Sequence, residues 1–270
     1  MDSIILDLED AVAENQKDAA RFSLYHALKT IDYGDTEVIV RINGLDTPHW
    51  QEDIRVCVAG GADGIRIAKC ESAQDVKTVE KAVEEAEEEF GVEKGRTLLM
   101  AALESPKGIL NAYEICAASE RMFGVAISGG DFRRCMQTKP TASGIDMLVA
   151  RGQMLLAARA AGVQCFDTVF TDLDDMEGFK NEVIQNKQMG FDGKSLINPK
   201  QIRLVHEIFA PTEKEIIQAE AWVSAFREAQ KKGIGVFTVN GKMIDAAFIP
   251  GAERTLRLAK AYGMYEGDLV

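Results

Sequence analysis

The chain has 270 residues, of which 46% are hydrophobic, so it is long enough to bury one sizeable core. Its 43 acidic residues outnumber 31 Lys and Arg, and the formal net charge of -12 disfavours nucleic acid and anionic membranes as partners. Five widely spaced cysteines without a CxxC pair, and the lack of any apolar run near the roughly 20 residues of a membrane span, predict a cytoplasmic protein with reduced thiols.

Short aliphatic or β-branched runs recur along the chain, and each has the length of a buried strand. They are residues 4–8, 38–42, 64–67, 98–102, 124–127, 166–170 and 194–197. Longer stretches between them, such as Ala73 to Phe90 and Met147 to Ala161, have helical composition or periodicity. Strands that alternate with helices predict a parallel sheet covered by helices on its outside.

This alternation predicts an α/β fold of the TIM type, a (β/α)8 barrel, but a closed barrel needs eight strands and seven are counted. Because the first strand starts almost at Met1, we expect a barrel that lacks its first βα unit. A miscounted strand or a flatter doubly wound sheet is the alternative. We assign residues 1–210 to the barrel and residues 211–270 to a C-terminal helical extension, which we expect to pack on a neighbouring subunit.

In such barrels, the residues just past the C-terminal ends of the strands meet at one rim. The polar residues at these positions are Asp7, Glu9, Asp10, Arg41, Asn43, Lys69, Glu104, Ser105, Asp131 and Asp172. Glu104 and Asp131 are the first carboxylates after adjacent strands, and such a pair can hold a hard ion that keeps several waters, as Mg²⁺ usually does. The alternative is that these acids cap the following helices or pair with Arg133 or Arg134.

Other rim residues suggest how a substrate would be held. Arg41 stands in the apolar run VIVRIN, where its guanidinium can grip a carboxylate, or form a structural salt bridge to the acids of LDLED, or do both. Free amides at Gly129 and Gly130 can bind a carboxylate or keto oxygen, although a tight turn is the commoner use of such a pair. Lysines at loop ends, namely Lys69, Lys194 and Lys242, can meet phosphates but are more often solvated.

Five segments together resemble a known family. They are LDLEDAV (Leu6 to Val12), VRIN (Val40 to Asn43), AALES (Ala101 to Ser105), FDGKSLINPKQI (Phe191 to Ile202) and NGKMID (Asn240 to Asp245). The chain is similar to the citrate lyase β subunit (citryl-CoA lyase) group, within the malyl-CoA lyase and HpcH/HpaI aldolase superfamily of (β/α)8 barrels, and the likeness covers essentially its whole length.

The resemblance implies a role for each matching position. It implies that Glu104 and Asp131 bind Mg²⁺ and that Arg41 holds a carboxylate of the oxaloacetate portion, with the amides at Gly129 and Gly130 beside it. Glu9 and Asp10 are expected to support this site from behind. Asp245 is implied to act on the acetyl group as acid or base, in the site of a neighbouring protomer. From the residues alone, Asp245 is equally an N-cap before Ala246 and Ala247.

The implied activity is Mg²⁺-dependent cleavage of citryl-CoA, or of a citryl-acyl-carrier thioester, to oxaloacetate and an acetyl thioester. A malyl-CoA or citramalyl-CoA lyase is one alternative, and a non-catalytic scaffold subunit is another. The implied partners are the CoA or acyl-carrier thioester, further copies of the chain in a trimer or larger oligomer, and other citrate lyase subunits.

Two departures from the family bear on these expectations. Relatives usually begin with a further strand that carries a Phe-Val-Pro-Gly type segment near the substrate, and no such segment precedes the first strand here. Relatives also commonly have Glu-Asp where this chain has Gly130-Asp131. The second change removes one side chain but keeps the metal-binding acid, so we expect an altered rate or substrate preference with the metal retained.

Overall fold

The computed structural model describes residues 2–270 and divides into two compact units, residues 1–202 and 203–270. The strands of unit 1 are β1 (Ser3–Asp7), β2 (Glu37–Ile42), β3 (Gly64–Ile67), β4 (Leu98–Leu103), β5 (Met122–Ile127), β6 (Gln164–Asp167) and β7 (Gly193–Lys194). Its helices are η1 (Glu14–Gln16), α1 (Lys17–Thr30), α2 (Trp50–Gly60), α3 (Ala73–Phe90), α4 (Pro106–Leu110), α5 (Ala112–Cys116), α6 (Gly129–Met136), α7 (Ile145–Ala161), α8 (Met176–Met189) and η2 (Pro199–Gln201). The sequence placed the boundary at 210, whereas the division falls at the start of α9 (Ile202–Phe209).

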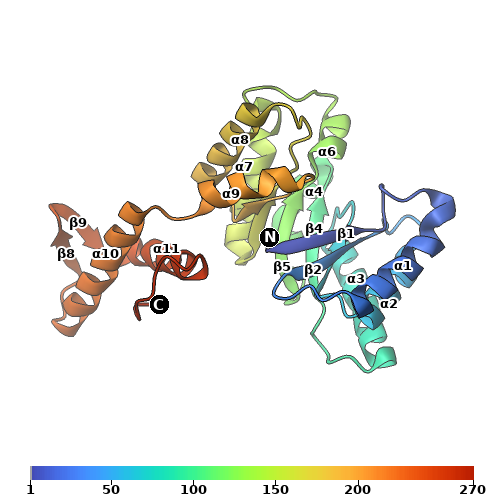
Figure 1. Cartoon of the computed structure of the whole chain (residues 1–270), viewed down its shortest axis with the longest axis horizontal. Coiled ribbons are helices and arrows are strands. Elements are labelled where there is room, and N and C mark those ends of the chain that lie inside the picture. The colour runs from blue at the N-terminus through green and yellow to red at the C-terminus, as the bar shows by residue number, and fades with distance from the viewer. Residues whose placement is uncertain (1) are drawn as a thin grey trace. The chain divides into compact units, whose positions relative to one another are not determined.

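The strands of unit 1 form one curled parallel sheet in the order of the chain, β1 to β7 (Figure 1). Each neighbouring pair is parallel, and a helical segment connects each strand to the next. The expected count of seven strands is thus confirmed for the parallel sheet of the described part of unit 1. Because every strand runs the same way, all carboxyl ends lie along one edge of the sheet.

The two faces of the sheet bury different side chains, as the alternation of strand residues requires. One face carries Val40, Ile65, Leu99, Val125 and Cys165, which belong to the core that the surrounding helices cover. Figure 1 shows α1, α2 and α3 side by side on that outer face. The other face carries the alternate residues, among them two arginines described below, so the sheet has an apolar outside and a partly charged inside.

The helices begin and end where their sequences dictate. Ser72 accepts a hydrogen bond from the amide of Asp75, and both halves of a capping box are present at the start of α3. Gly91 ends α3 in the left-handed conformation (φ 65°), which glycine adopts without steric cost. The predicted span Ala73 to Phe90 is confirmed, and the helix predicted from Met147 begins two residues earlier, at Ile145.

Two strands were predicted at the wrong residues. The sixth was expected at 166–170 but is Gln164–Asp167, because Gln164 and Cys165 pair with Gly124 and Val125 and so fix the register. The seventh was expected at 194–197 but comprises only Gly193–Lys194, since the chain leaves the sheet after Lys194. In both places an apolar run of strand length extends beyond the residues that find a partner strand.

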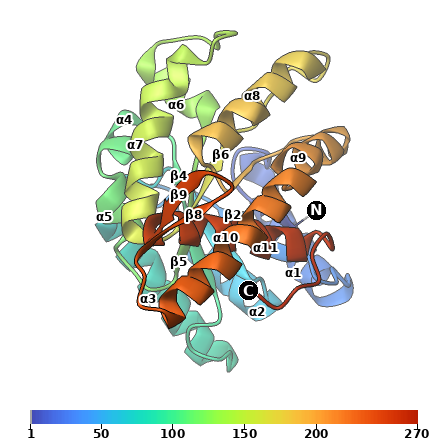
Figure 2. The ribbon, with the colours of Figure 1, turned by 90° about the vertical axis from the view of Figure 1, so that its left-hand side faces the viewer.

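Unit 2 has its own small core. It comprises most of α9 together with α10 (Glu213–Lys231), an antiparallel hairpin of β8 (Val236–Val239) and β9 (Lys242–Asp245), η3 (Ala246–Phe248) and α11 (Ile249–Ala261). Figure 2 shows α10 and α11 together with the hairpin. Val223, Ile244 and Leu256 from these elements are nearly inaccessible to solvent and pack in one cluster, so the helices and the hairpin are held by a shared apolar centre.

All five cysteines are free thiols, as expected from their spacing, and four of them are buried. Burial raises the pKa of Cys70 to about 12, so this thiol stays protonated at neutral pH. In the part of the chain that the structure describes, no helix is both long and apolar enough to cross a membrane.

Candidate functional site

The inner face of the sheet carries a row of charged side chains. Asp7 of β1 lies opposite Arg41 of β2, and Arg41 lies opposite Arg66 of β3. Residues two positions further along a strand point to the same face, one layer closer to the carboxyl edge. Glu9 follows Asp7 in this way. The sheet therefore gathers acids and arginines from neighbouring strands on its inner side, towards the rim where the strands end.

Arg41 is held by two acids. Its Nε and Nη2 donate hydrogen bonds to the two carboxylate oxygens of Asp7, at 2.6 and 2.7 Å, and its Nη1 lies 2.9 Å from Glu9 Oε2. These are the salt bridges to the LDLED acids that the sequence offered as one interpretation. Because Asp7 grips the fork along one edge, the orientation of the guanidinium is fixed. Its side chain remains 20% exposed, so its outer edge still faces the rim.

Glu9 is itself buried, with 4% of its surface exposed, and it joins two strands. Its Oε1 lies 2.7 Å from Lys69 Nζ, while Oε2 faces Arg41. The turn that carries Glu9 is stabilised by Lys17, whose buried ammonium donates hydrogen bonds to the carbonyls of Leu8 and Glu9, both at 2.8 Å. Asp10 is more exposed and lies 3.8 Å from Lys69 Nζ. Glu9 thus contacts Arg41 and Lys69 together, and its role in supporting the site stays a prediction.

Glu104 follows β4 directly and is 3% exposed. Its Oε1 accepts a hydrogen bond from the Ser128 hydroxyl at 3.1 Å, whereas Oε2 is enclosed and has no hydrogen-bond partner among residues 2–270. Burial raises the pKa of this carboxyl, and the negative charges of Glu9 and Asp131 raise it further. The charge of Arg66 and a hydrogen bond from the Lys69 backbone lower the pKa of Glu104, but they do not outweigh the effects that raise it.

Asp131 lies in the first turn of α6, the helix that follows β5. Its side chain is 21% exposed and forms an ion pair with Arg134 at 2.7 Å, one of the pairings that the sequence left open. The influence of Asp131 on the pKa of Glu104 places the two charges within mutual electrostatic range. The fold thus brings together the two carboxylates that the sequence singled out, from the ends of adjacent strands.

The start of α6 is capped by a residue from another strand. Ser128 occupies the N-cap position but makes no cap hydrogen bond, because its hydroxyl is directed to Glu104. Instead, Thr168 Oγ1, just past β6, accepts the hydrogen bond of the Gly129 amide at 2.8 Å. The amide of Gly129 is therefore not free, which corrects that part of the prediction. Gly130 has open space where a Cβ would lie, and its amide, second in the helix, has no acceptor within α6.

Arg66 was missed at the level of sequence. It is 6% exposed, and its Nη2 donates to Ser128 Oγ at 3.3 Å, so it reaches the hydroxyl that holds Glu104. Its Nε is buried without a hydrogen-bond partner among the described residues. Burial lowers the pKa of Arg66 to about 10, and the charge of Arg41 adds to the effect. The available signal was a charge inside the apolar run GIRI, the same feature that identified Arg41.

A second charged cluster lies beside the site and is structural in its contacts. Asp167, at the end of β6, accepts hydrogen bonds from Arg151 at 2.7 and 2.9 Å and from Lys194 at 2.9 Å. Lys194 also donates to the carbonyl of Thr168 at 2.6 Å. Its side chain is completely buried, so the suggestion that Lys194 meets a phosphate at a loop end is wrong. The cluster fixes the backbone of Thr168, whose hydroxyl caps α6.

Asp245 ends β9 in unit 2, and its contacts follow the capping interpretation. Its Oδ1 accepts a hydrogen bond from the amide of Ala247 at 2.9 Å, which makes it the N-cap of η3. The side chain is thereby oriented at a chain turn. A catalytic role for Asp245 stays a prediction.

The donor set at the rim fits a hard divalent cation. Within residues 2–270, no group of three or more His, Cys, Asp or Glu side chains is arranged to hold a metal, so the candidate rests on Glu104 and Asp131. Mg²⁺ is commonly bound through one or two carboxylates and keeps water or substrate at its other positions. Glu104 Oε2 is enclosed and has no hydrogen-bond partner among the described residues, so it is a donor atom that such an ion could use.

The Glu104 carboxylate should make the metal-free protein less stable at neutral pH. Because its pKa is raised in the folded state, stability is lost as pH rises from the ordinary value of 4.5 through the raised one. We therefore expect Glu104→Gln to melt a few degrees higher than the wild type at neutral pH with metal removed, and to show no such gain below pH 4.5. Thermal unfolding followed by circular dichroism measures this.

Adding Mg²⁺ should reverse the order of the two melting temperatures, so that the wild type melts higher than Glu104→Gln. Saturating Mg²⁺ stabilises whatever binds it in the folded state, so the wild type should gain more than Glu104→Gln. Glu120→Gln, a change at an exposed acid, serves as the matched control and should respond to Mg²⁺ like the wild type. If Glu104→Gln melts at a lower temperature than the wild type without metal, the prediction that the ionised Glu104 carboxylate destabilises the metal-free protein is wrong.

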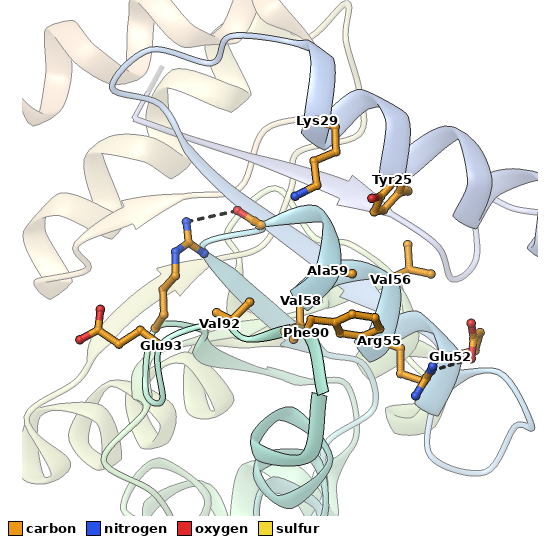
Figure 3. Close-up of a pocket in the computed structure, with 12 residues that line it drawn as sticks. Tyr25, Lys29, Glu52, Arg55, Val56, Val58, Ala59, Phe90, Val92 and Glu93 are labelled. Carbon is orange, nitrogen blue, oxygen red and sulfur yellow. Dashed lines mark hydrogen bonds and ion pairs between the residues drawn. The ribbon is translucent and has the colours of Figure 1, made fainter. Parts of the chain in front are cut away.

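A hollow of about 750 Å³ lies elsewhere on unit 1, and Figure 3 shows its lining, which includes Tyr25, Arg55 and Phe90. Gly61 and Arg96 in its wall precede β3 and β4, so it lies near the amino ends of the strands, away from the rim. Arg55 pairs there with Glu52 and Glu89, and Arg96 donates to the carbonyls of Gly61 and Ala62. Both arginines of the hollow are thus engaged by the protein, and we assign the chemistry to the rim, where the carboxylates and Arg41 lie.

Comparison with known proteins gives a consistent set of likenesses. The model of the HpcH/HpaI aldolase/citrate lyase family matches residues 1–199. The chain is 48% identical over 267 residues to the citrate lyase subunit beta of Leuconostoc mesenteroides subsp. cremoris, which covers 99% of this chain and 88% of that protein. The matched family region contains β1 to β7 and the rim residues, whereas the full-length relative also spans unit 2.

Solved structures agree. Protein CitE from Mycobacterium tuberculosis, in complex with magnesium, acetoacetate and coenzyme A, has a TM-score of 0.73 and 30% identity, covering 96% of this chain and 90% of that one. The citrate lyase beta subunit from M. tuberculosis complexed with oxaloacetate and magnesium has a TM-score of 0.65 and 30% identity, covering 78% and 87%. Both neighbours therefore share the fold, and both were solved with magnesium.

Proposed function

This chain belongs to the HpcH/HpaI aldolase/citrate lyase family, and from that premise we propose that its rim is the active site of a Mg²⁺-dependent lyase that cleaves citryl-CoA to oxaloacetate and acetyl-CoA. The observation that carries the proposal is the pair of carboxylates, Glu104 and Asp131, with Arg41 held beside them by Asp7 and Glu9. The neighbours that contain magnesium with coenzyme A or with oxaloacetate support the same chemistry.

Glu104 and Asp131 would hold the ion. When bound, Mg²⁺ supplies a positive charge for the hydroxyl and carboxylate oxygens of the citryl group and lowers the pKa of that hydroxyl. Ser128 keeps one oxygen of Glu104 in place and leaves the other available. The cap from Thr168 fixes the first turn of α6, which carries Asp131.

Arg41 orients the part of the substrate that becomes oxaloacetate. Asp7 and Glu9 contact all three of its nitrogens, but a guanidinium has five N–H groups, so one hydrogen on Nη1 and one on Nη2 are left. They can bind a substrate carboxylate end-on. Because Arg41 cannot rotate without breaking the bidentate pair with Asp7, the carboxylate is held in one orientation relative to the rim.

Bond cleavage and protonation balance within the site. The hydroxyl proton passes to solvent water as the bond between the carbinol carbon and the methylene next to the thioester breaks, and the electron pair of that bond stays on the methylene carbon. We assign the proton that this carbon takes up to Asp245, which acts as the acid. One proton is lost and one gained, so the citryl thioester becomes oxaloacetate and an acetyl thioester.

We further propose that Asp245 serves a neighbouring protomer, in a trimer or larger assembly of this chain. The support is that unit 2 folds around its own core and carries Asp245 at a fixed turn after β9. From the curled parallel sheet of seven strands and the family match we also assign unit 1 to a TIM-type architecture, and from the similarity to citrate lyase subunit beta we propose other citrate lyase subunits as partners. The cytoplasmic location stays a prediction from the cysteines.

The test is release of oxaloacetate from citryl-CoA by the purified chain, coupled to malate dehydrogenase, with and without Mg²⁺. We expect turnover with Mg²⁺ and essentially none after chelation, because the charge at the rim is then uncompensated. Turnover that is unaffected by chelation would contradict the metal site. A folded protein that binds Mg²⁺ but leaves citryl-CoA intact, alone and with the other citrate lyase subunits, would contradict the substrate.

A further inference from the structure

Arg66 is a second guanidinium on the inner face, and its surroundings differ from those of Arg41. The two arginines are cross-strand partners in the register of β2 and β3. Arg41 has two carboxylates against it, at 2.6 and 2.9 Å. The hydrogen bond of Arg66 goes to Ser128, a neutral hydroxyl, and its Nε has no hydrogen-bond partner among the residues described. Arg41 thus has carboxylates in direct contact, whereas among the residues described Arg66 makes no direct ion pair and is influenced by Glu104, Asp7 and Glu9 only at longer range.

A buried arginine without a carboxylate partner is costly, because a guanidinium removed from water keeps its charge and needs acceptors for its N–H groups. The pKa of Arg66 is lowered to about 10 by burial and by Arg41, yet the group remains charged at neutral pH. Glu104 is its nearest compensation, through Ser128, but Glu104 is the carboxylate that a bound cation would claim. With the cation present, the positive charge of Arg66 is left for a further anion.

Resting on the proposed function, we propose that Arg66 binds the second carboxylate of the oxaloacetate portion, the one that citryl-CoA has and citramalyl-CoA lacks. The first carboxylate, next to the carbonyl that forms, belongs to the cation and Arg41. Arg66 lies level with Arg41 on the inner face, but on the strand that pairs with β4, so its guanidinium faces a different arm of a bound substrate from the one that Arg41 holds. Arg66 thus sets specificity for a dicarboxylic product.

The experiment compares two thioesters that differ in one carboxylate. Arg66→Met should lower kcat/KM for citryl-CoA by about 100-fold, the usual cost of a lost hydrogen bond between charged groups, and change that for citramalyl-CoA by less than about threefold. Arg41→Met is the matched control on the neighbouring strand, and it should lower kcat/KM for both thioesters by the same factor. Arg66→Lys, which keeps the charge but not the fork, should recover part of the preference for citryl-CoA.

A binding measurement separates this inference from the proposed function. Calorimetry with Mg²⁺ should show that the wild type binds oxaloacetate more tightly than pyruvate, which lacks the second carboxylate, and that Arg66→Met loses this preference. If Arg66→Met weakens both ligands and both thioesters equally, Arg66 is only a counter-ion to Glu104 and the inference is overturned. If the wild type cleaves neither thioester but keeps the oxaloacetate preference through Arg66, the lyase assignment fails and the recognition of the carboxylate stands.

Discussion

Replacing Asp131 by Ala is expected to reduce Mg²⁺-dependent release of oxaloacetate at least about 1,000-fold, because a bound metal ion stabilises charge in the transition state by several kcal/mol. Asp131 is one of two carboxylates that we assign to the ion, and its side chain is partly open to solvent at the start of α6. Since the Gly129 amide is bonded to Thr168, the first turn of α6 should stay folded in the variant. Steady-state kinetics with citryl-CoA over a Mg²⁺ titration measure the effect.

Arg134→Ala is the matched control for this change. Arg134 pairs with Asp131 at 2.7 Å, but its side chain is 73% exposed, so the pair contributes little to stability. Removing it frees Asp131 without deleting the carboxylate, and the rate should stay near that of the wild type. Near-normal turnover by Asp131→Ala would refute the site, whereas equal losses in both variants would point to the ion pair in place of the metal.

Asp167→Ala should be the most destabilising single change, costing about 3–5 kcal/mol of unfolding free energy and lowering Tm by roughly 6–20 °C. The carboxylate is fully buried against Arg151, Lys194 and Asn186, so its removal leaves two buried cations with Glu182 as their one shared carboxylate partner among the described residues. Urea and thermal unfolding measure the loss. Asp174→Ala, at an exposed acid in the loop after β6, is the control and should change stability little.

The stabilisation by Asp167 has a defined pH dependence. Burial raises the pKa of its carboxyl, but Lys194 and Arg151 outweigh that effect and hold it below 3.8. A lowered pKa means that the stabilisation is fully present above 3.8 and is lost only as pH falls through the lowered value. The difference between wild type and Asp167→Ala should therefore persist at pH 5. A difference that vanishes there would show that the cluster does not hold this carboxyl ionised.

Much of the fold followed from alternation alone. The first five strands were predicted to within about two residues of their ends, because each is a short, mostly aliphatic run between polar residues. The prediction of the sixth strand was wrong because Phe166 to Phe170 resembles a strand in its composition. The chain leaves the sheet after Asp167, whose side chain binds Lys194 in the buried charged cluster. A hydrophobic run indicates that its residues are buried, but it does not indicate which of them form backbone hydrogen bonds with a neighbouring strand.

The site was only partly accessible from the sequence. Searching for polar residues just past strand ends found Glu9, Glu104 and Asp131, but it passed over Arg66, which lies inside its strand and reaches the rim through its length. Thr168 was passed over for a different reason. A hydroxyl that caps a helix 39 positions earlier leaves no local signal, because its partner is adjacent only after β5 and β6 have paired.

That distant cap also has a consequence for the order in which the chain matures. Synthesis proceeds from the amino end, so α6 leaves the ribosome before Thr168, and its first amide has no acceptor until β6 has added to the sheet. Asp131 therefore acquires its final position late. A nascent chain that has completed only β1 to β5 holds both acids of the site but not the support for their geometry, so metal capture is deferred until most of unit 1 has been made.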